Sequence, residues 1–440
     1  MNIRLDTLQR IIADFHTKQL PELTPRDAKM RFVRDMSLTV VGARRSGKTF
    51  RTYQFINEHL RAGHGIKNVC RIQFNDHRLS GLSVADLSLI DEAYYSLYPE
   101  KRGVEEILFV FDEIHRIEGW EDYILHLLDF STHRVLITGS TSRLLRGEIA
   151  SALRGKNLPV ELYPFSFREF LRHYRTEQDA VTSRGQSHLR KQFVHYLQQG
   201  GFPGLLDADE SIHVDILQTY WDTMVLRDII EAHPEANIPL SVFAPFAQAL
   251  AARTSCPFTV RAIVGGLREA GLSFSAETIY DYLRFLEGAF MIFTVPIYSK
   301  SEKIRQRNYH KVYMIDWGLA QAVAPAEGVD VSRQFENLVY LEFRRRGWDV
   351  SYFRTRQGWE IDFVAVRKSG RTVLRQVCQV AYSLKDKAAR ERELRGLPET
   401  VRHLGLKRAT IVTLNDEEDI VLNGVQIRIV PAWKWLLEDW

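Results

Sequence analysis

The spacing of apolar residues divides the chain into segments with different expected structures. Residues 3–16 carry apolar side chains at intervals of three and four, which is typical of one face of a helix. Short apolar runs then alternate with helical patterns, which predicts a parallel sheet with both faces covered. These runs are residues 37–41, 69–74, 107–111, 135–138 and 160–162. The pattern therefore favours an α/β domain that begins near residue 36.

The second half of the chain predicts helices followed by a further set of strands. Residues 180–235 are helical in pattern, with an interruption at the glycine-proline turn 200–203. Beyond residue 240, three helices and two strands appear in the order of a winged helix-turn-helix. They cover residues 242–253, 259–269, 276–288, 290–298 and 311–315. A last helix and three strands are expected at 334–346, 350–353, 360–366 and 373–380.

Residues 42–49 contain the strongest chemical signal in the chain. Their sequence, GARRSGKT, fits the phosphate-binding pattern G-x-x-x-x-G-K-[ST] and lies between a predicted strand and a predicted helix. The backbone N–H groups of such a loop curl around phosphates at the helix start. Lys48 is expected to reach the β- and γ-phosphates, and the Thr49 hydroxyl to ligate Mg²⁺. The expected nucleotide-binding residues are Gly42, Ala43, Arg44, Arg45, Ser46, Gly47, Lys48, Thr49 and Phe50.

Two neighbouring carboxylates follow the buried run 107–111. Because parallel strands end at the same sheet edge, Asp112 is expected to help hold Mg²⁺ and Glu113 to act as the general base toward water. This pair indicates hydrolysis rather than nucleotide binding alone. The strand at 135–138 leads to Ser140, which we select over Thr138 and Thr141 as the residue that senses the γ-phosphate; a helix N-cap is the alternative role.

These residues, with four further stretches, resemble a family of predicted bacterial and archaeal AAA+ ATPases with a C-terminal domain of uncharacterised function. The stretches are DEIHRIEGWE at 112–121, ITGSTS at 137–142, LYPFSFREF at 162–170, and QFEN at 334–337 with EIDF at 360–363. The resemblance implies ATP as the nucleotide and assembly of several copies of the chain into a ring. It also implies an N-terminal helical segment (1–35), an ATPase core (36–175), a helical lid (176–238), a winged-helix-like domain (239–327) and a restriction-endonuclease-like domain (328–440).

The resemblance implies two further parts of the ATP site: a basic residue that acts between subunits and a turn that lies against the adenine. The first differs from the family pattern, and the second has an alternative role. A basic residue is expected to act on the neighbouring subunit's γ-phosphate. In this chain a lysine, Lys156, stands where the family has arginine. The candidates are therefore Lys156, Arg154, Arg143 and Arg146. Pro203, in the turn 200–203, is expected to lie against the adenine, unless the turn only ends a helix.

Basic residues in the second half of the chain are candidate DNA contacts. A basic stretch between the two strands of the winged-helix-like unit would form a wing that contacts phosphates, although a solvated hairpin has the same pattern. An arginine triplet near residue 345 is a second candidate, with a solvated helix end as its alternative. The candidates are Lys300, Lys303, Arg305, Arg307, Lys311, Arg344, Arg345 and Arg346.

The last domain carries only part of a nuclease site. Asp362 matches the first acid of a restriction-endonuclease-like site, and Glu336 on the preceding helix can supplement it. Gln376 and Cys378 stand where the family requires an acid and a lysine. We therefore expect this domain to be inactive as a nuclease and to bind DNA or another protein.

Composition narrows the function classes further. With 45% hydrophobic and 26% charged residues, the chain of 440 residues has the composition of a globular protein, and its net charge of +4 is too small to indicate a nucleic-acid partner without local evidence. Its three cysteines form neither a disulfide framework nor a metal knuckle, and no apolar run reaches the ~20 residues of a membrane span, which favours the cytoplasm. The leading hypothesis is an ATPase that remodels or moves on DNA; the alternatives are an ATP-dependent signalling or defence switch and, less favoured, an ATP-dependent nuclease.

Overall fold

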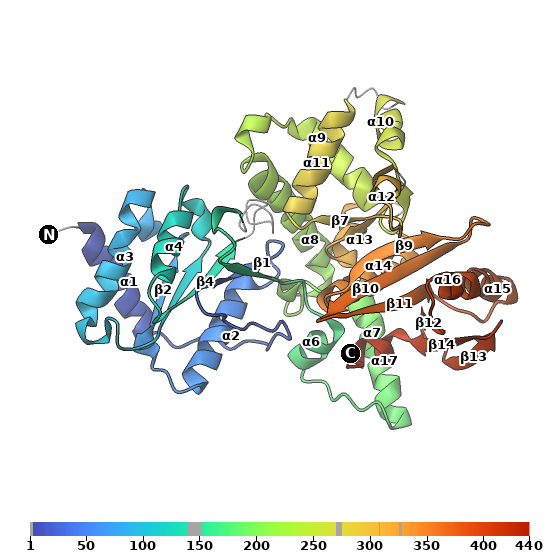
Figure 1. Cartoon of the computed structure of the whole chain (residues 1–440), viewed down its shortest axis with the longest axis horizontal. Helices are drawn as coiled ribbons and strands as arrows, with labels where there is room; N and C mark the ends of the chain where they lie inside the picture. The colour runs from blue at the N-terminus through green and yellow to red at the C-terminus, as the bar shows by residue number, and fades with distance from the viewer. Residues whose placement is uncertain (1–2, 140–150, 270–274, 308, 325–327, 440) are drawn as a thin grey trace. The chain divides into compact units, whose positions relative to one another are not determined.

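The structure is a computed structural model of the chain, and it describes residues 3–139, 151–269, 275–307, 309–324 and 328–439. The chain forms two compact units, Met1–Leu162 and Tyr163–Trp440. In the described residues, the first unit contains one sheet and the second contains two (Figure 1). Each unit has its own hydrophobic core. No helix in the described ranges is both long enough and apolar enough to cross a membrane.

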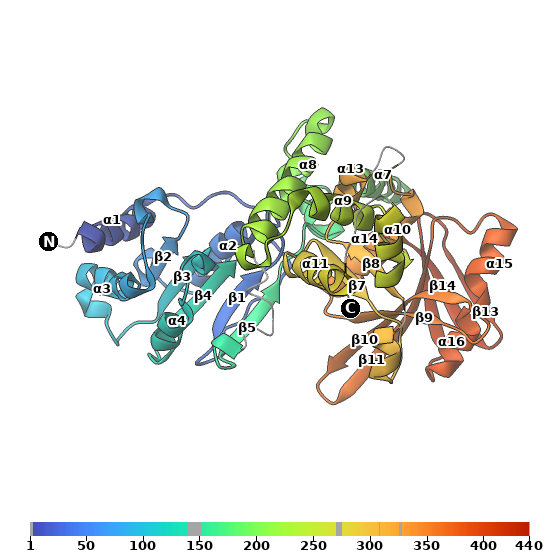
Figure 2. The same ribbon diagram turned by 90° about the horizontal axis from the view of Figure 1, so that it is seen from above.

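The first unit is built on a five-stranded parallel sheet with the strand order β2-β3-β4-β1-β5. On one face, Phe15 and Ile56 pack against apolar strand residues, and on the other Tyr94 and Tyr123 contact Phe109 and Phe111. Helices therefore cover both faces of the sheet (Figure 2). The elements are α1 (Ile3–Thr17), β1 (Ser37–Val41), α2 (Lys48–Arg61), β2 (Val69–Gln73), α3 (Ser88–Leu97), β3 (Ile107–Asp112), α4 (Glu121–Leu128), β4 (His133–Gly139) and β5 (Asn157–Glu161).

The second unit begins with helices and continues into a three-stranded antiparallel sheet ordered β6-β8-β7. The predicted strand 290–298 is shorter than expected, because Pro296 has no N–H to donate to a ladder. A short helix, α12, occupies part of the expected wing. The elements are α6 (Phe167–His173), α7 (Ser183–Gln199), α8 (His213–Thr223), α9 (Leu240–Ala251), β6 (Pro257–Phe258), α10 (Val260–Glu269), α11 (Ala276–Gly288), β7 (Ile292–Val295), α12 (Glu302–Arg307), β8 (His310–Met314) and α13 (Trp317–Val323).

The unit ends in a six-stranded mixed sheet ordered β13-β14-β12-β11-β10-β9. Strands β9, β10 and β11 are antiparallel, whereas β11, β12 and β14 run parallel. Phe343 on α14 packs on Phe363 at one face, and Leu397 and Val401 on α16 belong to the core of the other. The elements are α14 (Val331–Arg345), β9 (Asp349–Arg354), β10 (Glu360–Ser369), β11 (Thr372–Ala381), α15 (Lys387–Arg395), α16 (Leu397–His403), β12 (Arg408–Thr413), β13 (Glu418–Leu422), β14 (Val425–Pro431) and α17 (Ala432–Leu437).

The fold class predicted from the sequence is confirmed as mixed α/β with a parallel-sheet core, and two further sheets lie in the described residues of the second unit. In the first unit, β1 lies between β4 and β5, so the strand order reverses beside it. Ligands of open α/β sheets bind at the carboxyl ends of strands near such a reversal. A ligand site is therefore expected at this edge of the sheet.

Candidate functional site

The loop between β1 and α2 has a backbone that only glycine can supply at two positions. Gly42 has φ 153°, and a Cβ atom there would lie 2.2 Å from the carbonyl oxygen of Leu162. Gly47, the residue before α2, has φ 96°. Both conformations are costly for residues with a side chain. The glycines at the two ends of the predicted phosphate loop are therefore required by its shape.

Lys48 is buried, and its ammonium group lies inside this loop. Nζ donates hydrogen bonds to the carbonyl oxygens of Gly42 at 3.0 Å and Ala43 at 2.9 Å. A guanidinium N–H of Arg26 holds the loop from outside, at 2.8 Å from the Ser46 carbonyl oxygen. A positive charge on a strand-to-helix loop fits the phosphates of a nucleotide. Arg44 and Arg45 belong to the loop, and Phe50 is exposed on the first turn of α2.

The carboxylate of Asp112, at the end of β3, is fully buried and connects three strands. It accepts hydrogen bonds from the hydroxyls of Thr138 at 2.5 Å and Thr49 at 3.3 Å. Arg71 on β2 donates to its other oxygen at 3.1 Å. Thr49 and Asp112, the two residues predicted to share Mg²⁺, are thus hydrogen-bonded to each other. Arg71 is not among the residues predicted for this site, although a cation inside the apolar run 69–74 is a visible signal in the sequence.

Glu113 has a strained backbone that presents its side chain at the sheet edge. Its φ and ψ are 62° and 37°, a left-handed conformation that is uncommon outside glycine and is often found at functional sites. Its N–H donates to the Thr138 hydroxyl at 3.1 Å, and its carboxylate lies 3.5 Å from the Nε2 atom of His115. The Thr138 hydroxyl on β4 thus contacts both the Asp112 carboxylate and the backbone N–H of Glu113. Ser140, which we had selected, and Thr141, Arg143 and Arg146 lie outside the described residues.

The two described candidates for a residue acting on a neighbouring subunit are both at the surface of the first unit. Arg154 has φ 51°, and its guanidinium lies 3.9 Å from a carboxylate oxygen of Asp122. The Lys156 ammonium lies 3.6 Å from Asp129. Weak surface ion pairs such as these leave either group available to a partner. The role itself stays a prediction.

The conformation of the turn at residues 200–203 is explained by contacts with Asp316 in the second unit. Gly200 has φ 92°, and a Cβ atom there would lie 2.5 Å from Oδ1 of Asp316. The N–H of Gly201 donates to Oδ2 of the same carboxylate at 2.7 Å. Burial raises the pKa of Asp316 to about 6, against the effect of the Gly201 N–H. Pro203 opens the short turn Pro203–Leu205, and its expected contact with adenine stays a prediction.

Three of the expected DNA contacts are wrong because the side chains hold the second unit together. Lys311 is only 1% exposed and is surrounded by carboxylates. Arg345 donates to the carbonyl oxygens of Pro164 and Phe165, at 3.1 and 3.2 Å. Arg346 donates to Glu342, at 2.7 Å, and to the carbonyl oxygens of Trp435 and Leu436 at the end of α17.

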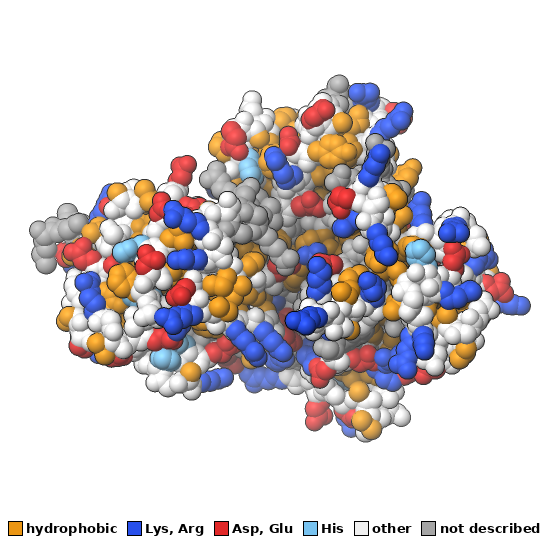
Figure 3. All heavy atoms as spheres, viewed as in Figure 1, with side chains coloured by type: hydrophobic (Ala, Val, Ile, Leu, Met, Phe, Trp, Pro, Cys, Tyr) orange, Lys and Arg blue, Asp and Glu red, His pale blue; other side chains and the backbone are white. Residues whose placement is uncertain are grey.

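The remaining basic candidates differ in exposure. Lys300, Lys303 and Arg305 are exposed, with Arg305 3.7 Å from Glu302. The guanidinium of Arg344 lies over the ring of Phe293, 5.5 Å from its centroid. The side chain of Arg307 is outside the described part of the structure. On the face seen in Figure 3, basic and acidic side chains of the second unit are interspersed.

The two predicted acids of the terminal domain do come together, around Lys311 from β8. The ammonium lies 2.9 Å from Glu336, 2.9 Å from Glu360 and 3.2 Å from Asp362. The Tyr313 hydroxyl also donates to Glu336, at 2.6 Å. Burial and the Asp362 charge raise the pKa of Glu336 to about 7, against the effect of Lys311. The cluster therefore contains a lysine that the sequence motif lacked.

The expected position of Gln376 in this cluster is wrong. In the β10–β11 ladder Asp362 lies opposite Gln379, since Phe363 pairs with Cys378. The amide oxygen of Gln379 accepts from the N–H of Asp362 at 3.2 Å, and its amide nitrogen donates to Glu393 at 2.8 Å. Gln376, three residues earlier, projects from the other face of the sheet.

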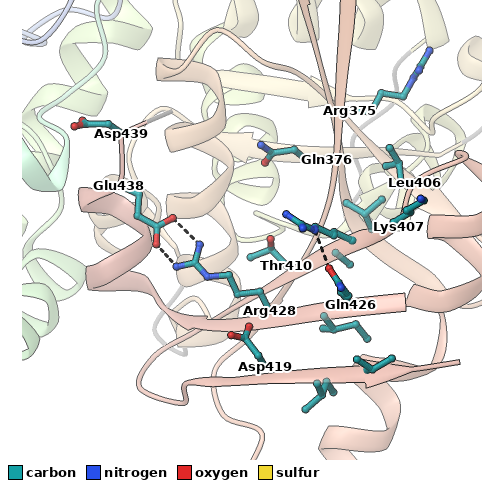
Figure 4. Close-up of a pocket in the computed structure, with 16 residues that line it drawn as sticks. Arg375, Gln376, Leu406, Lys407, Thr410, Asp419, Gln426, Arg428, Glu438 and Asp439 are labelled. Carbon is teal, nitrogen blue, oxygen red and sulfur yellow. Dashed lines mark hydrogen bonds and ion pairs between the residues drawn. The ribbon is translucent and has the colours of Figure 1, made fainter. Parts of the chain in front are cut away.

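Gln376 lines a hollow of about 930 Å³ over β11, β12, β13 and β14. The hollow contains charges of both signs, and Arg428 pairs with Glu438 across it (Figure 4). Arg408 donates to Gln426 at 2.9 Å. Because basic, acidic and amide side chains all line it, the hollow does not show a preference for an anionic ligand.

Part of the chain matches a described family of protein domains. Residues 34–171 match the AAA domain family, and residues 190–330 match a domain of unknown function. The chain is 32% identical to the uncharacterised protein MJ1544 of Methanocaldococcus jannaschii over 427 residues, which cover 94% of this chain and 90% of that protein. The chain therefore belongs to the same family as this archaeal protein. An uncharacterised protein of Haemophilus influenzae is 28% identical over 403 residues, 91% of this chain and 94% of that one.

Solved structures resemble the chain only loosely. A Walker-type ATPase of Pyrococcus abyssi has a TM-score of 0.40 and 15% identity, with 66% of this chain and 91% of that chain covered. The Orc1 protein of Aeropyrum pernix, solved in complex with DNA, has a TM-score of 0.27 and 12% identity over 74% of this chain and 92% of that one. At these values no property passes from those proteins to this chain.

Proposed function

We propose that this AAA-domain protein binds ATP with Mg²⁺ and hydrolyses it at the edge formed by β1, β3 and β4. One observation carries the proposal: the hydroxyl of Thr49, in the phosphate loop, lies 3.3 Å from Oδ1 of Asp112 at the end of β3. A hydroxyl and a carboxylate in contact beside a buried lysine are the groups that Mg²⁺ and a triphosphate require.

Each residue of the edge has a distinct part in this chemistry. Lys48 would move from the loop carbonyls to the phosphates, and Thr49 and Asp112 would hold Mg²⁺, which neutralises charge that develops on the phosphates. Glu113 is placed by its left-handed backbone to orient and deprotonate water. The Thr138 hydroxyl bonds to the carboxylate of Asp112 and to the backbone N–H of Glu113, and so couples the β4 strand to both residues.

We further propose that residues 239–327 form a winged-helix-like unit that contacts DNA. The order α9-β6-α10-α11-β7-β8, with β8 between β6 and β7, supports this. The second helix of the pair, α11, carries Tyr280, Asp281 and Arg284 on its exposed face, with Arg284 paired to Asp281 at 3.1 Å. This face is not basic, so the contact would be to phosphates, through Lys300, Lys303 and Arg305, rather than to bases.

We also propose that residues 328–440 form an inactive nuclease-like shell, and the order of their elements supports this. A helix, three antiparallel strands, two helices and a parallel strand follow one another, and Glu336 and Asp362 meet at the start of the second strand. The Lys311 ammonium occupies the space among the carboxylates where a cation would bind. Gln379 contributes no charge. We therefore propose that this part serves binding rather than cleavage.

Steady-state ATP hydrolysis with and without single-stranded, duplex and branched DNA tests the proposal, together with the mass of the assembly. We expect Lys48→Ala to weaken ATP binding and Glu113→Gln to bind ATP but turn it over at least about a hundredfold more slowly. Parental turnover in Glu113→Gln would refute the base assignment. Stimulation by one DNA form in an oligomer supports a DNA-remodelling motor; assembly with ATP and no response to DNA supports the signalling switch instead.

A further inference from the structure

Two histidines and a glutamate form a cluster in the first unit that the nucleotide site does not use. His59 lies in the last turn of α2, His64 follows in the loop after this helix, and Glu106 directly precedes β3. One ring nitrogen of each histidine and one carboxylate oxygen of Glu106 all lie within 4.8 Å of one another. Three potential metal-ligating atoms from three separate segments thus converge.

His59 shows that the cluster has an unfilled bonding requirement. The residue is 9% exposed, and its Nε2 atom is buried without a hydrogen-bond partner in the described part of the chain. Buried polar atoms in proteins are almost always bonded.

The other two side chains are placed to complete a site. The His64 ring stacks on that of His59, with centroids 3.9 Å apart and planes 3° apart. His64 stands between Gly63 and Gly65 in the loop that follows α2. Arg134 on β4 holds Oε2 of Glu106 at 2.9 Å and orients this carboxylate.

We propose that His59, His64 and Glu106 bind a Zn²⁺ ion. Two imidazole nitrogens and a carboxylate oxygen are ligands that Zn²⁺ accepts at about 2.0–2.2 Å, in a tetrahedral site where ligand atoms are roughly 3.4 Å apart. Ligation therefore requires the three atoms, which lie within 4.8 Å of one another, to approach by up to about 1.4 Å. A water molecule completes the four ligands.

This site lies far from the nucleotide. His59 comes eleven residues after Lys48 on the same helix, a distance of about 17 Å along its axis. The ion would join the carboxyl end of α2 to the amino end of β3, whose opposite ends carry the phosphate loop and Asp112. The proposal concerns binding and does not depend on ATP hydrolysis.

Titration of the chelator-treated full-length protein with Zn²⁺, in excess Mg²⁺ to occupy carboxylate sites, tests the proposal. We expect one Zn²⁺ per chain, and for Co²⁺ the visible absorption of a four-coordinate ion. His64→Ala and Glu106→Gln should each weaken binding at least about a hundredfold. His77→Ala, which removes a histidine whose side chain is 95% exposed in the same unit, should bind like the parent.

Circular dichroism of the metal-free variants distinguishes loss of metal binding from loss of folding. Both substitutions lie at the surface end of the cluster, so the metal-free spectrum and melting temperature should be unchanged. Zn²⁺ should then raise the melting temperature of the parent and of His77→Ala only. Absence of binding to the parent overturns the proposal. Equal binding in His64→Ala and Glu106→Gln overturns it as well, since the ion must then be elsewhere.

Discussion

Replacement of Lys311 by methionine is the sharpest test of the second unit's electrostatics. Three carboxylates lie 2.9, 2.9 and 3.2 Å from the Lys311 ammonium, which is almost fully buried. Methionine keeps the length of the side chain but leaves these acids without their cation. Removal of one partner from a buried ion pair costs about 3–5 kcal/mol, so we expect the free energy of unfolding to fall by that amount at pH 8.

The pH dependence separates charge from packing. Burial and Asp362 already raise the pKa of Glu336 to about 7 in the parent protein, and loss of Lys311 raises it further. A carboxyl whose pKa is higher in the folded than in the unfolded protein stabilises the fold at low pH, and this stability is lost as pH rises through the folded pKa. The variant's deficit should therefore shrink from pH 8 to pH 5.5 by up to about 1.4 kcal/mol, which corresponds to the one pH unit between the parent's folded pKa of about 7 and pH 8.

Urea unfolding followed by tryptophan fluorescence measures this deficit. Every tryptophan except Trp120 lies after residue 162, so the signal reports mainly on the second unit. Lys303→Met, at an exposed lysine of the same unit, is the matched control and should change stability by less than about 0.5 kcal/mol. An unchanged midpoint in Lys311→Met, or a deficit that grows on acidification, would refute the reasoning.

Three further outcomes are expected in the first unit. Gly42→Ala brings a Cβ atom to 2.2 Å from a carbonyl oxygen and should weaken binding of a fluorescent ATP analogue at least about tenfold, whereas Gly103→Ala, with φ 72° and open space, should not. Arg71→Met leaves the buried Asp112 carboxylate without its cation and should lower stability by about 3 kcal/mol in thermal melts, unlike the exposed Arg78→Met; equal melting temperatures would contradict the pairing. Burial lowers the pKa of His133 to about 4, so the parent should lose up to about 3 kcal/mol as pH falls from 6.5 toward 4, because the unfolded imidazole takes up the proton first. His133→Gln should flatten this part of the urea stability profile, and the same slope in both proteins would show that another group is responsible.

Features built from neighbouring residues could be predicted from the sequence alone. The phosphate loop is eight consecutive residues, and its glycines and lysine have the same roles wherever a strand leads into a helix. Asp112 and Glu113 follow an apolar run that could only be a buried strand, so their position at the sheet edge followed from the parallel pattern. Most helices and strands were predicted for the same reason, since periodicity is a local property.

The tertiary structure decided which partners distant residues meet. Lysine is normally exposed, so Lys311 appeared to belong to a basic wing, and only the approach of α14 and β10 shows that carboxylates bury it. Gln376 was misplaced because the ladder depends on the turn: Ser369 pairs with Thr372 across two residues, which brings Gln379 opposite Asp362. The meeting of His59 and His64 with Glu106, and of Arg71 with Asp112, likewise depends on strand order, which no local pattern contains.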